Sequence, residues 1–238
     1  MTAEGSALVV VLVVMVGAVG LVIGVLLLRE RAAQRRIARL TGWAAEAGWT
    51  YSATGSPGLL TRWKGAPFVH VGVDPGIDDV LTGHVDGFPA TSLRFGYTLV
   101  VGKAQKRVRF HVVAIELPAS LPTVEVLPEV AAMRVGKAIG AARRDLQFES
   151  EDFNQRWFVM SPDPRLAHSI IHPGLMEWML GAPEVMWRIE GSSLLTWSPG
   201  STDVDEVLPK ARHLVSVAQA IPRFVWLERG FDPTRSED

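Results

Sequence analysis

An uninterrupted apolar segment near the N-terminus is the strongest pattern in the chain. It reads ALVVVLVVMVGAVGLVIGVLLL from Ala7 to Leu28 and contains no charged residue. A helix of this length extends about 33 Å, which exceeds the roughly 30 Å hydrocarbon core of a bilayer. The sequence therefore predicts a transmembrane helix over residues 7–28, preceded by a short extracytoplasmic tail over residues 1–6.

Arginines follow this segment directly, whereas only Glu4 carries a charge before it. A cleaved secretory signal has the opposite order, with basic residues before a shorter apolar stretch. Basic residues stay on the cytoplasmic side, so we expect the N-terminus outside the cell membrane and everything after Leu28 in the cytoplasm. Near the surface these arginines are expected to contact anionic lipid headgroups. They are Arg29, Arg31, Arg35, Arg36 and Arg39.

A helix-compatible segment without proline continues from the apolar run to Ala47. Ile37, Leu40 and Ala44 recur at helical spacing, which predicts a juxtamembrane stalk helix over residues 29–48 with one apolar stripe. Gly48 is suited to end it. We expect a cytoplasmic domain over residues 49–229 and a disordered tail over residues 230–238.

After Trp49 the pattern changes to period two, which is typical of strands. We expect strands at residues 66–73, 80–85, 89–100 and 106–117, with a turn at DPGIDD, residues 74–79. The last two should form an antiparallel hairpin with one buried face. Basic residues gather at its tip, where they could contact lipid or an acidic partner. Charge at a hairpin end also blocks aggregation, and we favour that ordinary reading.

The second half of the chain predicts more helix. We expect a helix over residues 164–180 with a break before Pro173, a hairpin of residues 184–190 and 193–198, and a helix from Asp205, its N-cap, to about Ile221. Residues 129–144 are also compatible with a helix. Strands first and helices mainly in the C-terminal half indicate an α+β fold, with an antiparallel-sheet domain behind the membrane and stalk helices.

Composition excludes several classes of function. The chain has no cysteine, so it forms no disulfide or thiolate site, and its net charge is −1. Residues 29–39 carry a net charge of +4 and residues 40–238 a net charge of −4, so the domain itself lacks the basic face that nucleic-acid binding requires. No phosphate-binding or dinucleotide-binding loop and no nucleophile elbow occurs, so we expect no cofactor and favour a non-enzymatic protein.

Two groups of residues suggest metal chemistry. His168 and His172 in HSIIH have the spacing that places two imidazoles on one helix face. A serine replaces the glutamate of the metalloprotease motif, and Pro173 disfavours helix at His172. The acids from Asp74 to Asp86 lack the oxygen pattern of a calcium loop. We therefore expect no metal site, and keep a membrane-tethered metal-dependent hydrolase as the alternative function.

The motif FESEDFNQRW, residues 148–157, combines acids, amides and aromatics. Ser150 is a suitable N-cap, and Glu151 and Asp152 would follow in the first turn, where carboxylates favour the helix dipole. Its two phenylalanines are expected in the core. Asn154 and Arg156 either hold the loop through hydrogen bonds or point into a pocket, and the sequence leaves both readings open.

The stretch DLQFESEDFNQRWFVMSPDPRLAHSIIHPGLMEWML, with the small hairpin and terminal helix that follow, resembles an uncharacterised family of actinobacterial single-pass membrane-anchored proteins that share an F-E-S-x-x-F-N motif. The similarity extends over residues 49–225. The resemblance implies a membrane anchor and a domain of unknown role, and it supplies no catalytic residue.

Taken together, these patterns predict a single-pass membrane protein whose cytoplasmic domain acts as a binding or scaffolding module. Its expected partners are the lipid bilayer and a protein at the cytoplasmic face. Gly20 and Gly24 form a small-xxx-small motif in the apolar segment, which predicts a weak homodimer.

Overall fold

The computed structural model describes residues 3–69, 72–130 and 145–234, and within the first helix it describes side chains only for residues 15–17 and from 19 onward. The helix-compatible residues 131–144 therefore lie outside the described residues. So do residues 1–2 of the expected N-terminal tail.

A single helix, α1, runs over Ala3–Ala47. It ends at Gly48, which has a φ of 70°, and the Trp49 N–H donates to the Ala44 carbonyl at 2.7 Å. This is a Schellman C-cap, which needs a left-handed residue and therefore favours glycine. Residues 3–6, which we expected in a tail, belong to the helix.

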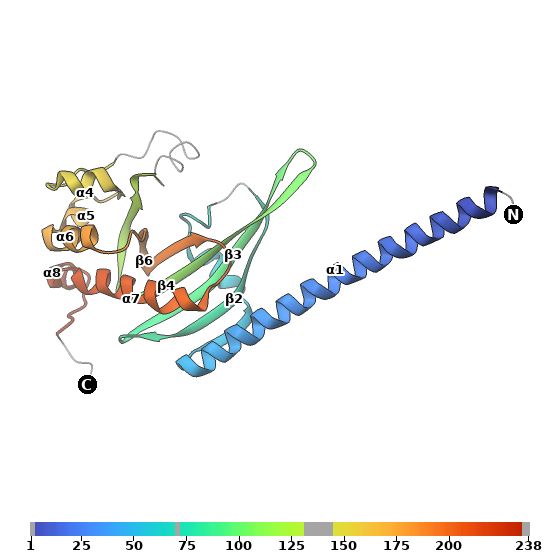
Figure 1. The fold of residues 1–238 in the computed structure, drawn as a ribbon. Coiled ribbons are helices and arrows are strands. Elements are labelled where there is room, and N and C mark those ends of the chain that lie inside the picture. Colours follow the sequence, from blue (N-terminus) through green and yellow to red (C-terminus); the bar gives the residue numbers. More distant parts are fainter. Residues whose placement is uncertain (1–2, 70–71, 131–144, 235–238) are drawn as a thin grey trace.

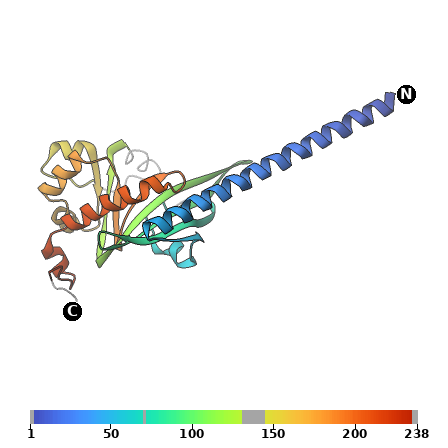
Figure 2. The same ribbon diagram turned by 60° about the horizontal axis from the view of Figure 1, so that its bottom comes forward.

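The free part of α1 projects away from the folded domain (Figures 1 and 2). Among the side chains that the structure describes, no helical stretch is both long enough and apolar enough to cross a membrane. Of the predicted span Ala7–Leu28, residues 7–14 and 18 lie outside the described side chains.

An antiparallel sheet forms the centre of the domain and confirms the predicted α+β class. Its order is β1-β2-β3-β4-β5, with β6 also paired to β4. The first half of β4 lies between β3 and β6, and its second half lies between β5 and β6. The strands are β1 Thr50–Thr54, β2 Val73–Val85, β3 Phe88–Val101, β4 Ala104–Pro128, β5 Trp157–Met160 and β6 Trp187–Pro199.

The predicted β3–β4 hairpin is present, with Val101 opposite Ala104 and Gly102 at a φ of 61°. Of the strand expected at residues 66–73, residues 70 and 71 lie outside the described residues; the prediction is wrong for residues 66–69 and 72, and Val73 begins β2. Residues 57–62 form the short helix α2, Pro57–Arg62, and residues 66–68 form a turn. The apolar side chains of this segment are buried without forming a strand. Trp63 and Phe68 pack together against the sheet with ring centroids 5.0 Å apart.

The predicted turn at residues 74–79 is also wrong, because these residues belong to β2. Register shifts occur between Val73 and Gly76 and between Asp78 and Leu81. Asp74 and Asp79 have φ values of 55° and 51°. The stretch is therefore an irregular, bulged strand, and a bulge tolerates the same left-handed residues that a turn does.

The hairpin predicted at Gly191 is wrong as well. β6 is one strand through this point, with Gly191 at a φ of 62° opposite Leu121 of β4. The ladder between β4 and β6 is irregular there, with shifts between Glu116 and Leu121 and between Leu121 and Val124. The glycine therefore lets β6 follow the irregular course of β4 and does not reverse the chain.

The helices of the second half are α4 Glu151–Arg156, α5 Pro164–Ile170, α6 Pro173–Gly181, α7 Val204–Ala220 and α8 Arg223–Leu227. The break before Pro173 is as predicted. The N-cap of α7 is Asp203 and not Asp205, and Pro209 lies inside the helix. Residues 230–234, expected in the tail, fold back on the domain: Phe231 packs edge-on to Trp226, and Asp232 pairs with Arg223.

Both faces of the sheet are covered, which corrects the prediction of one buried face. α7 lies across one face beside the C-terminal end of α1, and α4, α5, α6 and α8 gather at one end (Figures 1 and 2). The larger core cluster lies with these helices and includes Leu40, Leu81 and Leu214. On the opposite face a smaller cluster joins Trp63 and Phe68 to the sheet.

Candidate functional site

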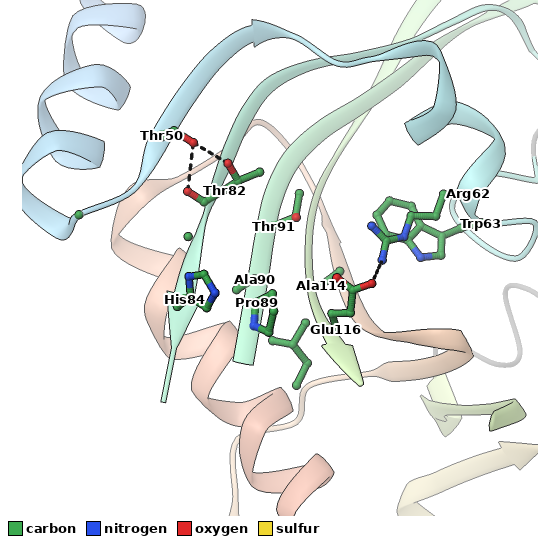
Figure 3. Close-up of a pocket in the computed structure, with 13 residues that line it drawn as sticks. Thr50, Arg62, Trp63, Thr82, His84, Pro89, Ala90, Thr91, Ala114 and Glu116 are labelled. Carbon is green, nitrogen blue, oxygen red and sulfur yellow. Dashed lines mark hydrogen bonds and ion pairs between the residues drawn. The ribbon is translucent and has the colours of Figure 1, made fainter. Parts of the chain in front are cut away.

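A hollow of about 400 Å³ lies on the sheet beside α2 (Figure 3). Its floor is a row of small side chains from four neighbouring strands, because Thr50 pairs with Thr82, Thr82 with Thr91, and Thr91 with Ala114. Residues opposite one another in a sheet share a face, so the three threonines line one surface. We call this hollow the threonine pocket.

The rim of the threonine pocket carries charge. Arg62 at the end of α2 pairs with Glu116 of β4 at 3.3 Å, and His84 of β2 lies on the other side of the hollow (Figure 3). Thr50 and Thr82 share a hydrogen bond of 2.6 Å between their hydroxyls. Among the described lining residues, no hydroxyl is bonded to a histidine or carboxylate. The pocket is thus suited to bind a small polar group and has no pair arranged for proton transfer.

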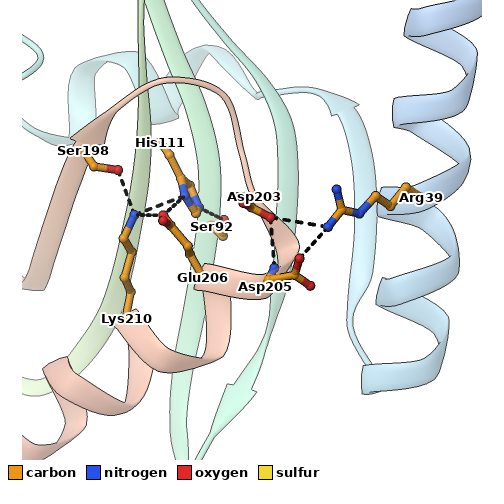
Figure 4. A network of polar contacts seen from close by, with 8 residues as sticks. All are labelled: Arg39, Ser92, His111, Ser198, Asp203, Asp205, Glu206 and Lys210. Atoms are coloured by element: carbon orange, nitrogen blue, oxygen red, sulfur yellow. Dashed lines mark hydrogen bonds and ion pairs between the residues drawn. The ribbon is translucent and has the colours of Figure 1, made fainter.

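A second arrangement looks catalytic at first sight (Figure 4). Ser92 Oγ lies 2.9 Å from His111 Nε2, and His111 Nδ1 lies 3.7 Å from a Glu206 carboxylate oxygen. This is the chain of groups found in serine hydrolases. Ser92 and His111 are, however, 0% and 1% exposed, so no substrate reaches the hydroxyl.

The proton on His111 is also in the wrong place for catalysis. Lys210 Nζ lies 3.4 Å from His111 Nδ1 and donates to Ser198 at 2.8 Å. An ammonium group can only donate, so Nδ1 accepts and Nε2–H donates to Ser92. A nucleophilic serine needs the opposite tautomer. The network therefore ties α7 to β3, β4 and β6 as a structural element.

His111 should make folding depend on pH. Burial and the Lys210 charge lower its pKa to about 4, below the ordinary 6.5. Between these values the unfolded chain binds the proton and the folded chain does not, so stability rises with pH, by about 3 kcal/mol across the window. Burial raises the pKa of Asp78 to about 6, which acts in the opposite direction. We therefore compare wild type with His111→Gln.

Denaturant unfolding at a series of pH values from 4 to 7 checks this prediction. As pH falls, the free energy of unfolding of wild type should decrease relative to that of His111→Gln, because only wild type loses the His111 contribution. Burial also lowers the pKa of His213 to about 4. Asp78 and His213 are present in both proteins, so their contributions cancel in the difference. A difference that is constant with pH would show that His111 does not titrate as described.

An ion cluster holds α1 on the domain. Arg36 Nε of α1 and Arg94 Nη1 of β3 each lie 3.3 Å from Asp79 Oδ2. Both contacts are ion pairs that lack hydrogen-bond geometry. Tyr51 donates to the other Asp79 oxygen at 3.2 Å, and Arg94 also pairs with Asp78. The Asp79 side chain is 2% exposed, and burial raises its pKa. We call this group the stalk clamp.

Arg39 adds a second link from α1, pairing with Asp205 at 2.7 Å and Asp203 at 3.5 Å (Figure 4). Arg36 and Arg39 were expected at lipid headgroups, but the structure pairs both with acids of the domain. Of the five predicted arginines, Arg36 is partly buried, whereas Arg29, Arg31, Arg35 and Arg39 are exposed. Local sequence carries no signal for these partners, because Asp79 and Asp205 are distant along the chain.

A fully buried arginine holds the opposite face of the sheet. Arg188 of β6 is 1% exposed and lies 2.9 Å from Glu190 and 3.7 Å from Glu125, which is itself 3% exposed. It also donates to the Ala66 carbonyl and stacks over Trp197 at 5.2 Å. A Cβ on Gly65 would lie 2.4 Å from the guanidinium, so any larger residue there would require the buried arginine to shift.

The two histidines of HSIIH take separate partners. His168 ring nitrogens lie 2.7 Å from the Pro164 carbonyl and 3.1 Å from the Gln147 carbonyl. His172 caps α6, and its Nε2 lies 3.0 Å from the Ala220 carbonyl. In the described part of the chain, no group of three or more His, Asp or Glu side chains is arranged to hold a metal.

The motif around Asn154 is a closed loop. Asn154 accepts from the Phe148 N–H at 2.9 Å and donates to the Phe148 carbonyl at 2.8 Å. Ser150 caps α4, and Phe148 and Phe153 pack edge to face in the core. Arg156 donates to the Leu180 carbonyl at 2.7 Å. The side chains of Asn154 and Arg156 thus bind backbone groups, which is the first of the two arrangements that the sequence left open.

The fold and these contacts define an antiparallel-sheet α+β domain with an N-terminal helical extension. The fold is similar to that of a solved protein, the mycobacterial trehalose monomycolate transport factor A, TtfA. The TM-score is 0.51 at 17% sequence identity, and the match covers 78% of this chain and 95% of the other. No protein-family model and no curated protein matches the sequence.

Proposed function

We propose that this chain is a non-enzymatic binding module held at the cytoplasmic face of the cell membrane by α1. The observation that carries the proposal is the contrast between the two ends of that helix. Leu40 and Ala44 near its C-terminal end are 2% exposed. Between Met15 and Leu28 the described valine, leucine, isoleucine and methionine side chains are 40–71% exposed.

Such an exposed apolar surface is unfavourable in water, at about 25 cal/mol per Å². It packs on no part of the described domain, so it requires another apolar environment. The uncharged run from Ala7 to Leu28 and the arginines after it favour a bilayer, with the domain on the cytoplasmic side. The stalk clamp would then fix how the domain is oriented toward the membrane.

Binding is favoured over catalysis by the sites themselves. The threonine pocket offers hydroxyl groups and a paired Arg62 and Glu116. The buried Ser92 and His111 lack access and the necessary tautomer. TtfA, whose fold is similar, is by name a transport factor for trehalose monomycolate, which supports a binding role in a transport process. Membership in the actinobacterial membrane-anchored family, and a weak homodimer through Gly20 and Gly24, remain part of this proposal.

Membrane extraction tests the anchor. Full-length protein should stay with membranes after an alkaline wash, and the double substitution Val22→Arg with Ile23→Arg should release it. Each arginine within the apolar span costs about 3 kcal/mol of insertion free energy. Both positions are more than half exposed, so the domain should fold as before.

Ala33→Arg is the matched control, since Ala33 is exposed on the same helix beyond the apolar segment. It should remain in the membrane fraction. Wild-type protein that washes off would overturn the anchor, and a C-terminal reporter active only after export would overturn the orientation. For the binding role, crosslinking in membranes should capture a protein partner at a threonine-pocket position such as Thr91.

A further inference from the structure

We propose that the tip of the β3–β4 hairpin is a second membrane contact, inserting Val100 and Val101 among anionic lipid headgroups. The inference rests on the proposed membrane anchor and adds a binding site to it. Val100 and Val101 are 51% and 74% exposed at the apex of the hairpin. Charge alone would be enough to block aggregation, whereas this apex also presents two apolar side chains to solvent.

Charge surrounds these valines. From Thr98 to Arg109 the chain has no acidic residue, and its basic residues are Lys103, Lys106, Arg107 and Arg109. Arg107 is engaged by Asp74 at 3.3 Å. The other three are exposed, and of these Lys103 and Lys106 lie nearest the apex. Apolar side chains flanked by lysines are suited to a surface of anionic lipids, because the valines enter the interface while the ammonium groups meet phosphate.

The hairpin also extends in the required direction. Both views place it on the same side of the domain as the free end of α1 (Figures 1 and 2). The tip and the apolar part of α1 can therefore meet one surface, provided that the hairpin is long enough.

The lengths of α1 and of the hairpin can be compared from the stalk clamp, because Arg36 of α1 and Arg94 of β3 both contact Asp79. From Arg36, α1 reaches Leu28 after about 12 Å, at 1.5 Å per residue. From Arg94, β3 reaches Val101 after about 23 Å, at roughly 3.3 Å per residue. Even at an inclination of about 45° to the helix, the strand would advance about 16 Å. The tip thus reaches the level at which the apolar part of α1 begins.

Site-specific labelling of the full-length chain in lipid nanodiscs tests this contact. The chain has no cysteine, so Val101→Cys gives a single site for an environment-sensitive fluorophore. Glu228→Cys, exposed at the end of α8, is the control. In phosphatidylglycerol nanodiscs, lipids with a nitroxide near the headgroup should quench the label at residue 101 and not the one at residue 228.

Charge reversal provides the second arm. Lys103→Glu with Lys106→Glu in the Val101→Cys background should weaken the tip contact about 25-fold or more, at about fivefold per lysine. Phosphatidylcholine nanodiscs should weaken it similarly. The near-UV spectrum should be unchanged, because all three positions are exposed.

The outcomes separate the two proposals. Protein retained in nanodiscs with an unquenched label at residue 101 would overturn the tip contact and leave the anchor standing. Protein that does not enter nanodiscs at all would overturn both. A label that is shielded in native membranes but not quenched in pure lipid would show that the tip meets a protein, which also overturns the lipid contact.

Discussion

Arg188→Met is expected to destabilise the domain by about 3–5 kcal/mol, the cost of removing one partner from a buried ion pair. The substitution leaves the Glu125 carboxylate beside a methionine at a position that is 3% exposed. Glu190 is less affected, because it also accepts from the backbone N–H groups of Lys64 and Gly65 at 2.6 and 3.3 Å. Thermal unfolding of detergent-solubilised full-length protein should show a midpoint lower by about 10 °C or more.

Two further variants make this result specific. Adding Glu125→Gln to Arg188→Met should recover part of the loss, because a neutral amide is less costly to bury than a carboxylate. Arg62→Met removes an arginine from the Arg62–Glu116 pair, which has the same chemistry on a part-exposed rim. That change should cost less than about 1 kcal/mol. Equal losses at Arg62 and Arg188 would contradict the role of burial.

Local patterns predicted the elements whose contacts are near in sequence. The stop of α1 at Gly48, the β3–β4 hairpin and the Ser150 cap each depend on residues a few positions apart, and all three are present. The errors lie where distant partners decide the structure. Gly191-Ser192 is a good local turn signal, but pairing with both halves of β4 keeps β6 continuous.

The polar sites were missed for the same reason. Thr50, Thr82 and Thr91 form a pocket only because three strands align them, and each threonine alone is an ordinary strand residue. Arg188 stands in a strand whose two faces are both covered, so alternation could not show that it is buried. In the sequence, Asp79 belongs to DPGIDD, whose pattern predicts a turn. Its left-handed φ and its pairing with Arg36 depend on the irregular ladder of β2.

Asp79→Asn is expected to destabilise the docked end of α1 by about 3 kcal/mol, since it leaves two arginine side chains near a neutral amide. Arg94 is 7% exposed and would retain only Asp78 as a carboxylate partner. Asparagine tolerates the left-handed φ of 51°, so the change removes charge with little added backbone strain. A spin label at Arg35→Cys, in the chain without other cysteines, should become more mobile as the last turns of α1 loosen.

Asp74→Asn is a closely matched control for this experiment. Asp74 also has a left-handed φ, 55°, and also pairs with an arginine at 3.3 Å, but its side chain is 83% exposed against 2% for Asp79. Exposed ion pairs contribute less than about 1 kcal/mol. Asp74→Asn should therefore leave both the unfolding midpoint and the spin-label mobility unchanged. If the two variants behaved alike, the stalk clamp would not be what fixes α1 to the sheet. A membrane-inserted α1 would then not determine how far the β3–β4 tip lies from the membrane.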